Sequence, residues 1–195
     1  MKLKYDTLTI EVDYDVISIE DVLIEETLND HGMMQITFLV SEDKAKEQVM
    51  REGANQVIRV TEGETSLFVG RLSGITMSCR KSQTILETSW ESFTAKYDEE
   101  RKKRAITAAD YTAADIIKEV IKPYKGLFQN AFPKGEPLSQ FLLQYGETDW
   151  EFLKRLAGKE GTILTPVNTS EAGVFWYGLP DGERKKIEDD YKCQY

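Results

Sequence analysis

From Thr7 to about Trp90, hydrophobic residues mostly recur at every second position. Met34, Ile36, Phe38 and Val40 fall on one side of an extended chain, and Gln35 and Thr37 fall on the other. This alternation predicts a half-buried strand. Similar patterns predict strands at 57–61, 66–72, 75–79 and 83–90, with turns at 62–64 and 80–82. Several short strands at this spacing indicate a small antiparallel barrel or sandwich.

Helical patterns appear at three places. The first is 42–52, with Ser41 as N-cap and Gly53 as its end. The second lies near 112–122, opens with the Thr-x-x-acid pattern of a capping box and presents Ile116, Ile117, Val120 and Ile121 on one face. Between these elements, 93–105 is predicted to be charged and irregular and 125–137 to be a connecting loop, because it is rich in Gly and Pro.

The third helix, near 149–159, has the clearest signals. Thr148 and Glu151 have the spacing of a capping box, in which the hydroxyl accepts from the third amide and the carboxylate accepts from the N-cap amide. An apolar face then follows at three- and four-residue spacing, and Gly161 is placed to end the helix. That face consists of Trp150, Leu153, Leu156 and Ala157. Strands are predicted on either side, at 138–145, 162–167 and 174–179, before a charged, exposed tail at 181–190.

Charge and composition exclude several classes of function. The net charge of −9 disfavours a nucleic-acid partner, because phosphate binding draws on clustered Lys and Arg. The one basic run, 101–104, follows three acidic residues and is predicted to be a solvated loop. No apolar run approaches 18 residues and no signal peptide is evident, so folding in the cytosol is expected. Cys79 and Cys193 with a single histidine argue against a zinc site, and no metal or cofactor is expected.

No catalytic group is assigned from the sequence. His31 is the only histidine, so any Ser-His or Cys-His mechanism must use it, yet its place in a strand-to-strand connection favours a structural hydrogen bond. Glu147, Asp149 and Glu151 could suggest a glycosidase or a metal site, but capping and first-turn dipole compensation explain Asp149 and Glu151 without chemistry. Gly70 is expected to permit close backbone packing or a bulge rather than to cradle a phosphate, as is Gly74. The aromatic residues, Phe68 and Trp150 among them, are assigned to the core rather than to a stacking platform.

The run Gln144–Ala157, QYGETDWEFLKRLA, resembles a segment of the VgrG-like spike proteins and phage baseplate hub (late control protein D-like) proteins of contractile injection systems. Other motifs agree in order, so that the resemblance spans about Thr27 to Gly178. They are Leu28-Asn29-Asp30-His31-Gly32, Leu67-Phe68-Val69-Gly70-Arg71-Leu72, the helix within Tyr111–Tyr124, and Trp176-Tyr177-Gly178. The residues taken as the structural motif are Thr148, Asp149, Trp150, Glu151, Leu153, Leu156, His31, Phe68 and Gly70.

The resemblance implies an α+β, mainly β protein. A barrel-like antiparallel domain at 1–92 would precede a mixed α/β domain at 93–195 that holds part of a second barrel. It also implies a non-enzymatic hub that forms a trimer, contacts tube, spike and baseplate proteins, and passes from the cytoplasm into a virion tail or injection apparatus. Longer family members continue past the point matching Tyr195. We therefore expect a fragment or a short hub, membrane piercing elsewhere, and strand edges near 174–179 left unpaired.

Two alternatives remain open at this stage. One is a tail-associated cell-wall hydrolase that uses Glu147 or Asp149 as its acid. The other is an isolated barrel module that binds carbohydrate or peptide.

Overall fold

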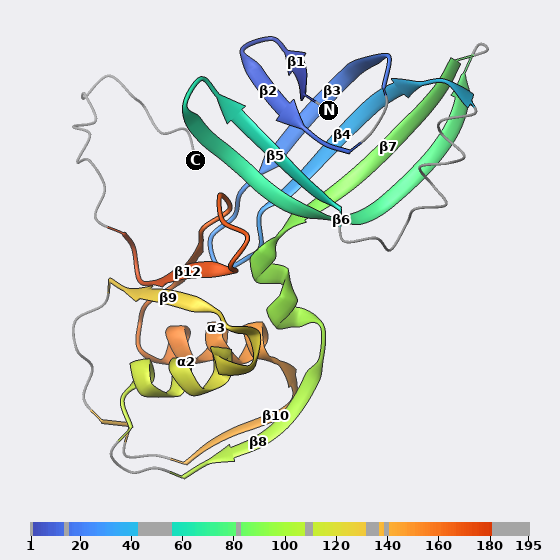
Figure 1. Cartoon of the computed structure of the whole chain (residues 1–195). Helices are drawn as coiled ribbons and strands as arrows, with labels where there is room; N and C mark the ends of the chain where they lie inside the picture. Colours follow the sequence, from blue (N-terminus) through green and yellow to red (C-terminus); the bar gives the residue numbers. More distant parts are fainter. Residues whose placement is uncertain are drawn as a thin grey trace, which may run out of the picture.

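A single curved antiparallel sheet forms the first part of the chain (Figure 1). The structure is a computed structural model that describes residues 2–13, 16–42, 56–80, 83–107, 111–131, 137–138 and 141–180. The sheet has the order β1-β2-β5-β6-β7-β4-β3 and is nearly closed, like a barrel. Its strands are β1 (Lys2–Tyr5), β2 (Leu8–Glu11), β3 (Ser18–Glu25), β4 (Met33–Val40), β5 (Val57–Glu62), β6 (Thr65–Arg80) and β7 (Gln83–Ser92).

The predicted alternation in β4 is confirmed, because Met34, Ile36, Phe38 and Val40 are all buried in one core. The two strands predicted at 66–72 and 75–79 are instead one long strand, β6, with a bulge between Leu72 and Gly74. Pairing between β5 and β6 ends at Arg71, so among the described strands only β7 pairs with the rest of β6. Met77 is exposed there, because alternation buries a face only where another layer covers it.

Gly70 permits close packing, as predicted. A Cβ atom added to Gly70 would lie 2.4 Å from the Phe68 ring and 2.9 Å from the carbonyl oxygen of Glu91. The fully buried ring of Phe68 therefore folds over the backbone of its neighbour two residues on, which only a glycine allows. The predicted helix at 42–52 lies outside the described residues except for Glu42, and Lys81 and Ser82 of the predicted turn lie outside them too.

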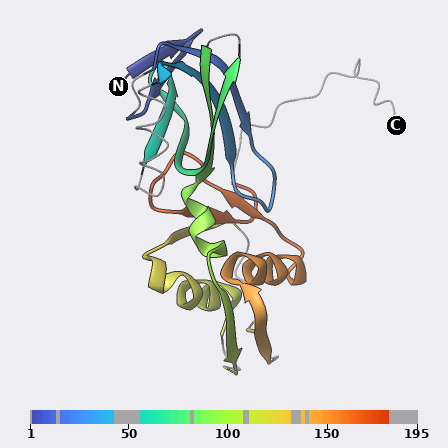
Figure 2. The same ribbon diagram turned by 90° about the vertical axis from the view of Figure 1, so that its right-hand side faces the viewer.

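The second part of the chain stacks two helices between two small sheets (Figures 1 and 2). Below the helices, β8 and β10 form an antiparallel ladder; above them, β9 pairs in parallel with β12, which also pairs with β11. The elements are the 3₁₀ helices η1 (Phe93–Asp98) and η2 (Lys122–Tyr124), the α-helices α2 (Ala113–Ile121) and α3 (Asp149–Lys159), and the strands β8 (Arg101–Ile106), β9 (Leu127–Asn130), β10 (Leu142–Thr148), β11 (Leu164–Pro166) and β12 (Val174–Tyr177).

Both helices begin and pack as the sequence predicts. Each N-cap threonine, Thr112 or Thr148, forms a complete capping box with the acidic residue three positions later. The apolar faces of α2 and α3 share a second core with residues of the strands. Gly161 has a φ of 69° just after α3, which fits its predicted place at the helix end.

Three predictions about this part are wrong. The segment 93–105 is not irregular, because it contains η1 and most of β8, and the basic run 101–104 is a strand rather than a solvated loop. The segment 125–137 contains β9. Finally, β12 lies in the middle of its sheet, so the expected unpaired edges near 174–179 do not arise at its backbone. The tail at 181–190 lies outside the described residues.

The predicted class is confirmed: the protein is mainly β, with a barrel-like antiparallel sheet followed by a mixed part that carries the helices. Each part has its own hydrophobic core. Among the described helices, none is both long and apolar enough to span a membrane.

Candidate functional site

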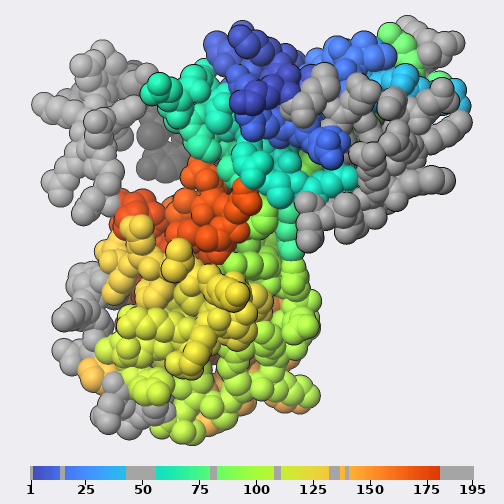
Figure 3. Space-filling view, in the orientation of Figure 1, coloured from blue at the N-terminus to red at the C-terminus, as the bar shows by residue number. Residues whose placement is uncertain are grey.

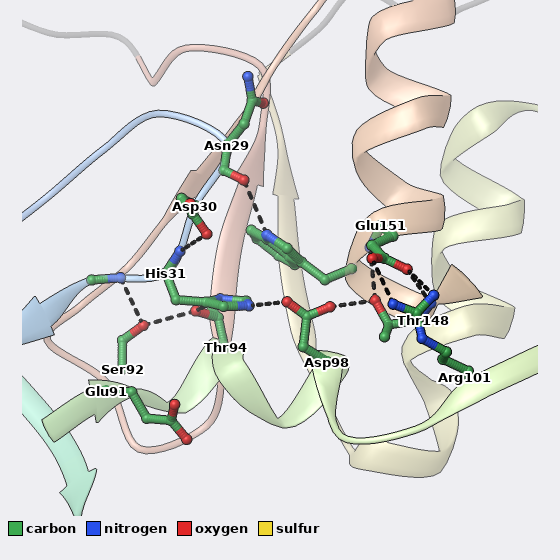
Figure 4. Close-up of polar contacts among 12 residues, drawn as sticks. Asn29, Asp30, His31, Glu91, Ser92, Thr94, Asp98, Arg101, Thr148 and Glu151 are labelled. Carbon is green, nitrogen blue, oxygen red and sulfur yellow. Dashed lines mark hydrogen bonds and ion pairs between the residues drawn. The ribbon is translucent and has the colours of Figure 1, made fainter. Parts of the chain in front are cut away.

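Motif residues that are distant in the sequence meet where the seven-stranded sheet joins the helical part (Figure 4). The loop between β3 and β4 brings Asn29 and His31, the end of β7 and η1 bring three polar side chains, and the start of α3 brings two more. We call this set the junction: Asn29, His31, Ser92, Thr94, Asp98, Thr148 and Trp150.

His31 is held at both ring nitrogens. Its Nδ1 lies 2.9 Å from the hydroxyl of Thr94, and its Nε2 lies 2.9 Å from the Asp98 carboxylate. The ring also packs against the indole of Trp150, with centroids 4.7 Å apart. Thr94 is in turn bonded to the Ser92 hydroxyl, which accepts from the backbone amide of Gly32. A neutral imidazole that donates from Nε2 to Asp98 and accepts at Nδ1 from Thr94 satisfies every group in this chain.

Asp98 links this chain of hydrogen bonds to α3. The Thr148 hydroxyl donates to the second oxygen of Asp98 and accepts from the Glu151 amide at 3.1 Å. The Glu151 carboxylate accepts from the Thr148 amide at 2.9 Å, which completes the capping box. Burial alone would raise the pKa of Asp98, but the hydrogen bonds from His31 and Thr148 outweigh it and lower the pKa below its ordinary value.

Asn29 joins the loop to two elements of the helical part. Its carbonyl oxygen accepts from the Trp150 indole at 3.1 Å, and its side-chain oxygen accepts from the Leu164 amide at 2.8 Å. Its own amide donates to the Leu164 carbonyl at 3.0 Å, so Asn29 binds both backbone polar groups of Leu164, one with its backbone and one with its side chain. Asn29 has a φ of 64°, a left-handed conformation that Asn adopts more readily than most residues.

Gly32 brings the loop against Asn168, in the connection between β11 and β12. A Cβ atom at Gly32 would lie 2.4 Å from the Asn168 side chain. The Asn168 carbonyl accepts from Val69 of β6 at 2.7 Å, and its amide nitrogen donates to Glu26 at 2.9 Å. The motif at 28–32 and the motif at 67–72 therefore both contact the helical part, through Gly32 and Val69.

A second polar cluster lies around Asp149, whose side chain is 0% exposed. Lys102 approaches it at 2.9 Å and Arg104 at 3.1 Å, while Tyr124 donates at 2.7 Å and Gln144 at 2.9 Å. Burial alone would raise the pKa of Asp149, but the hydrogen bonds from Gln144, Lys102 and Tyr124 and the charge of Arg104 lower it.

This cluster corrects the explanation of Asp149 from the sequence. Compensation of the helix dipole does not account for a fully buried carboxylate with four side-chain partners. Lys102 and Arg104, placed in a solvated loop by the sequence analysis, are two of those partners. The remaining motif residues of α3, Leu153 and Leu156, are buried in the second core as expected from their spacing.

The chemistry available to these groups is limited. Thr94, His31 and Asp98 follow the order of a catalytic triad, yet Thr94 is 0% exposed and its hydroxyl is already bonded to Ser92 and His31. A small pocket of about 280 Å³ beside His31 is lined by Glu25, Thr27, Asp30, His31 and Met33, but both ring nitrogens point into bonds within the protein.

The acidic candidates are engaged as well. Both oxygens of Glu147 are held by Arg155, at 2.5 and 3.1 Å. Within the described ranges, no group of three His, Cys, Asp or Glu side chains could hold a metal ion. Of the aromatic residues assigned to the core, Phe68, Trp90, Trp150, Phe152 and Phe175 are buried as predicted, whereas Trp176 is only partly buried.

Sequence reasoning found His31, Thr148 and Glu151 but missed their partners. Asp98 gave no signal because it stands in a run of three acidic residues. Lys102 and Arg104 gave a weak signal of a shared partner, since residues two apart lie on the same face of a strand.

Comparisons with known proteins place this junction in a known fold. Residues 98–174, which include Asp98 and the whole Asp149 cluster, match the family model of the phage tail baseplate hub (GPD). A comparison with curated protein sequences finds no match.

Three solved structures have a similar fold. The 43 kDa tail protein of prophage MuSo2 from Shewanella oneidensis has a TM-score of 0.68 at 19% identity, over 87% of this chain and 52% of that one. The tail protein from Neisseria meningitidis MC58 has a TM-score of 0.60 at 15% identity, over 87% and 49%. The E. coli c3393 protein, a type VI secretion component described as similar to the T4 bacteriophage tail proteins gp27 and gp5, has a TM-score of 0.60 at 16% identity, over 86% and 48%.

The chain thus spans about half the length of each of these structures. At these identities the likeness concerns the fold. The family match and the fold together confirm the resemblance to the phage tail baseplate hub and VgrG-like family that the sequence motifs predict.

Proposed function

We propose that this chain is a structural hub component of a contractile injection apparatus, such as a phage or prophage tail baseplate, a tailocin or a type VI-like spike, and that it joins tube to spike. The observation that carries the proposal is the junction. Its motif residues bond one part of the chain to the other, and their polar groups are directed at each other. The fold shared with tail proteins supports this reading.

The hub would consist of two domains, at 1–92 and 93–195, with the junction between them. Each would have its own core, and the polar bonds of the junction would fix their relative orientation. A component that transmits force between a tube and a spike needs such a fixed orientation. The motif residues Thr148, Trp150 and His31 would then act as fasteners between the two parts, with neither catalytic nor cofactor functions.

From the family resemblance we infer that three copies assemble around one axis; a closed cyclic ring of this kind leaves no contact surface unsatisfied. The proposed partners are further copies of this chain and the tube, spike and baseplate proteins of the same apparatus.

The cell-wall hydrolase is the less favoured alternative. A general acid needs access to substrate and a raised pKa, whereas Asp149 is fully buried with a lowered pKa and Glu147 is clamped by Arg155. A barrel that binds carbohydrate by stacking would present exposed aromatic rings. The described strands of the seven-stranded sheet present none, and exposed rings such as Tyr145 belong to the helical part.

Two measurements test the proposal together. Tail or injection particles purified from the source organism should contain the chain, as detected by mass spectrometry of particles that sediment intact. Purified chain should release no fragments from peptidoglycan. Turnover that disappears in a Glu147→Gln variant, or particles that lack the chain, would overturn the hub assignment.

A further inference from the structure

The junction holds the one histidine of the chain, His31, with its side chain only 10% exposed. A histidine between two parts of a protein ordinarily acts as a switch near neutral pH, because its charge changes between about pH 5 and pH 8. At this junction, however, the groups around the ring provide for both of its charge states. The response of the junction to pH therefore depends on the partners of His31 as much as on the ring itself.

The hydroxyls of Ser92 and Thr94 form a chain that can run in either direction (Figure 4). They lie 2.9 Å apart, and either one can be the donor. When the ring is neutral, Thr94 donates to its Nδ1 and Ser92 donates to Thr94. When the ring is charged, Nδ1 donates to Thr94 and Thr94 donates to Ser92. Only the hydrogen of the Ser92 hydroxyl then loses its acceptor in this chain.

Negative charge around the ring offsets that loss. On η1, the Asp98 carboxylate lies 2.9 Å from Nε2 of His31. On the side of the sheet, Glu25 and Asp30 line the small pocket beside the ring, and Asp30 also accepts from the His31 backbone amide at 3.0 Å. On α3 the ring meets the indole of Trp150, which carries no charge and whose face attracts cations. The charged ring therefore keeps its partners and gains an ion pair.

Asp98 has no such second arrangement. Its two oxygens accept from His31 Nε2 and from the Thr148 hydroxyl, and the charge of Lys154 on α3 also favours the carboxylate. A protonated Asp98 would place its own hydrogen among these donors. It would also leave a charged and mostly buried ring without its counterion. Both effects break bonds between the loop at 26–32 and the helical part.

We propose that the junction is a lock that stays closed whether His31 is neutral or charged, and that opens when Asp98 also takes up a proton. The direction of the Asp98 pKa agrees with this. Burial would raise that pKa, but the bonds from His31 and Thr148 lower it below the ordinary value of 3.8. A lowered folded pKa gives stability that is complete above the unfolded value and is lost as pH falls through the folded one. The lock should therefore open only below about pH 3.8.

Opening the junction frees one side of the helical part. The two parts are linked covalently only between β7 and η1, and each core draws on residues of its own part. A second contact lies on the other side of β7, where the Val69 amide donates to the Asn168 carbonyl at 2.7 Å and Arg59 pairs with Glu171. The teal residues of β5 and β6 touch the orange-red residues around β11 and β12 there (Figure 3). The helical part would therefore turn about this contact. The lock would operate whether or not the chain serves as a hub.

Nuclear magnetic resonance of the full chain tests the lock with two signals. The ring nitrogens of His31 are unambiguous because the chain has one histidine. The indole N–H of Trp150, assigned with a Trp150→Phe variant, reports the closed junction because it donates to the Asn29 carbonyl. Between about pH 8 and pH 5 the ring should change from protonation at Nε2 alone to protonation at both nitrogens, while the indole signal stays constant. The indole signal should change only below about pH 3.8.

Two variants should convert the lock into a switch near neutral pH. Thr94→Val removes the reversible hydroxyl, so the Nδ1 hydrogen of a charged ring has no acceptor. Asp98→Asn removes the counterion. In both, the indole signal should change between about pH 8 and pH 5, a rise of at least about one pH unit in the midpoint of opening. Asp149 is ionised in that range, so the change reports the junction and not the Asp149 cluster. Thr94→Ser is the matched control and should keep the wild-type midpoint.

Three results would overturn the proposal. A wild-type indole signal that follows the titration of the ring makes His31 the sensor. A ring that stays neutral down to the pH of opening excludes the reversal of the hydroxyl chain, and so does a Thr94→Val variant with the wild-type midpoint. The wild-type signals decide between these outcomes even where Thr94→Val does not fold. The hub proposal is judged separately, by the presence of the chain in sedimented particles.

Discussion

Replacing Asp149 by Asn removes a charge on which the helical part depends. The side chain keeps its shape, but one acceptor oxygen becomes an amide that donates. In the Oδ2 position that amide would face Lys102 and Tyr124, and in the Oδ1 position it would face Gln144; all three are donors to Asp149 in the native cluster. Two cations would also lose the charge that balances them. Both effects destabilise the folded state.

The size of the loss in unfolding free energy depends on how well water can solvate Lys102 and Arg104 once the Asp149 charge is gone. Removing one member of a buried ion pair costs roughly 3–5 kcal/mol, because the remaining charge is left uncompensated. Lys102 and Arg104 are 22% and 27% exposed, so solvent can recover part of this cost. We therefore expect the Asp149→Asn variant to lose about 3 kcal/mol of unfolding free energy near neutral pH.

The loss should depend on pH in a defined direction. The pKa of Asp149 is lowered in the folded state, so its contribution is complete above the unfolded value near 3.8 and is lost as pH falls through the lower folded value. Urea unfolding followed by tryptophan fluorescence should show a large difference between wild type and variant near pH 7. That difference should shrink below about pH 3.8.

Asp115→Asn is the control, since Asp115 is likewise an acidic residue in the first turn of a helix but its side chain is 45% exposed. Its effect should be much smaller than that of Asp149→Asn. Equal urea midpoints for wild type and Asp149→Asn at neutral pH would refute the idea that the buried cluster stabilises the fold. A difference that grew on acidification would refute the assigned direction of the pKa.

Other predictions concern the junction. Thr148→Ala should lower the unfolding free energy by about 2 kcal/mol, because it removes both the cap and a hydrogen bond to charged Asp98. Thr148→Ser keeps the hydroxyl and should stay near wild type. Equal urea midpoints for the two variants would contradict this. Trp150→Ala should lower the unfolding free energy by roughly 3–5 kcal/mol, because the buried indole is lost. Trp150→Phe should cost less, since a ring remains and the bond to Asn29 is the main loss. An unchanged urea midpoint for Trp150→Ala would mark the indole as dispensable. Chelator should leave the unfolding temperature unchanged, as followed by circular dichroism, and a clear drop would indicate a bound metal.

Local signals in the sequence were sufficient for the elements that carry them. The capping boxes at Thr112 and Thr148 and the apolar faces that follow give α2 and α3 correctly, because both the caps and the faces depend on residues three or four apart. The alternation in β4 works for the same reason, since one continuous core lies against that strand.

The strand β8 could not be found in this way. Its sequence is Arg-Lys-Lys-Arg-Ala-Ile, so neither face is apolar over most of its length. What turns Lys102 and Arg104 inward is the carboxylate of Asp149, which is 45 residues or more further along the chain. Only the fold brings them together. The same holds for β9, whose four residues pair with β12, a strand that follows α3 in the sequence.

The junction is polar where an apolar contact would have been simpler, and this has a mechanical consequence. An apolar contact between two cores resists separation but allows the surfaces to slide. At the junction, the Thr148 hydroxyl both caps α3 and bonds Asp98, and Asp98 in turn holds His31. A shift of the loop between β3 and β4 would therefore break directional bonds and uncap a helix at the same time. Because a buried group left without its partner costs more than the bond itself contributes, the arrangement favours one relative position of the two parts.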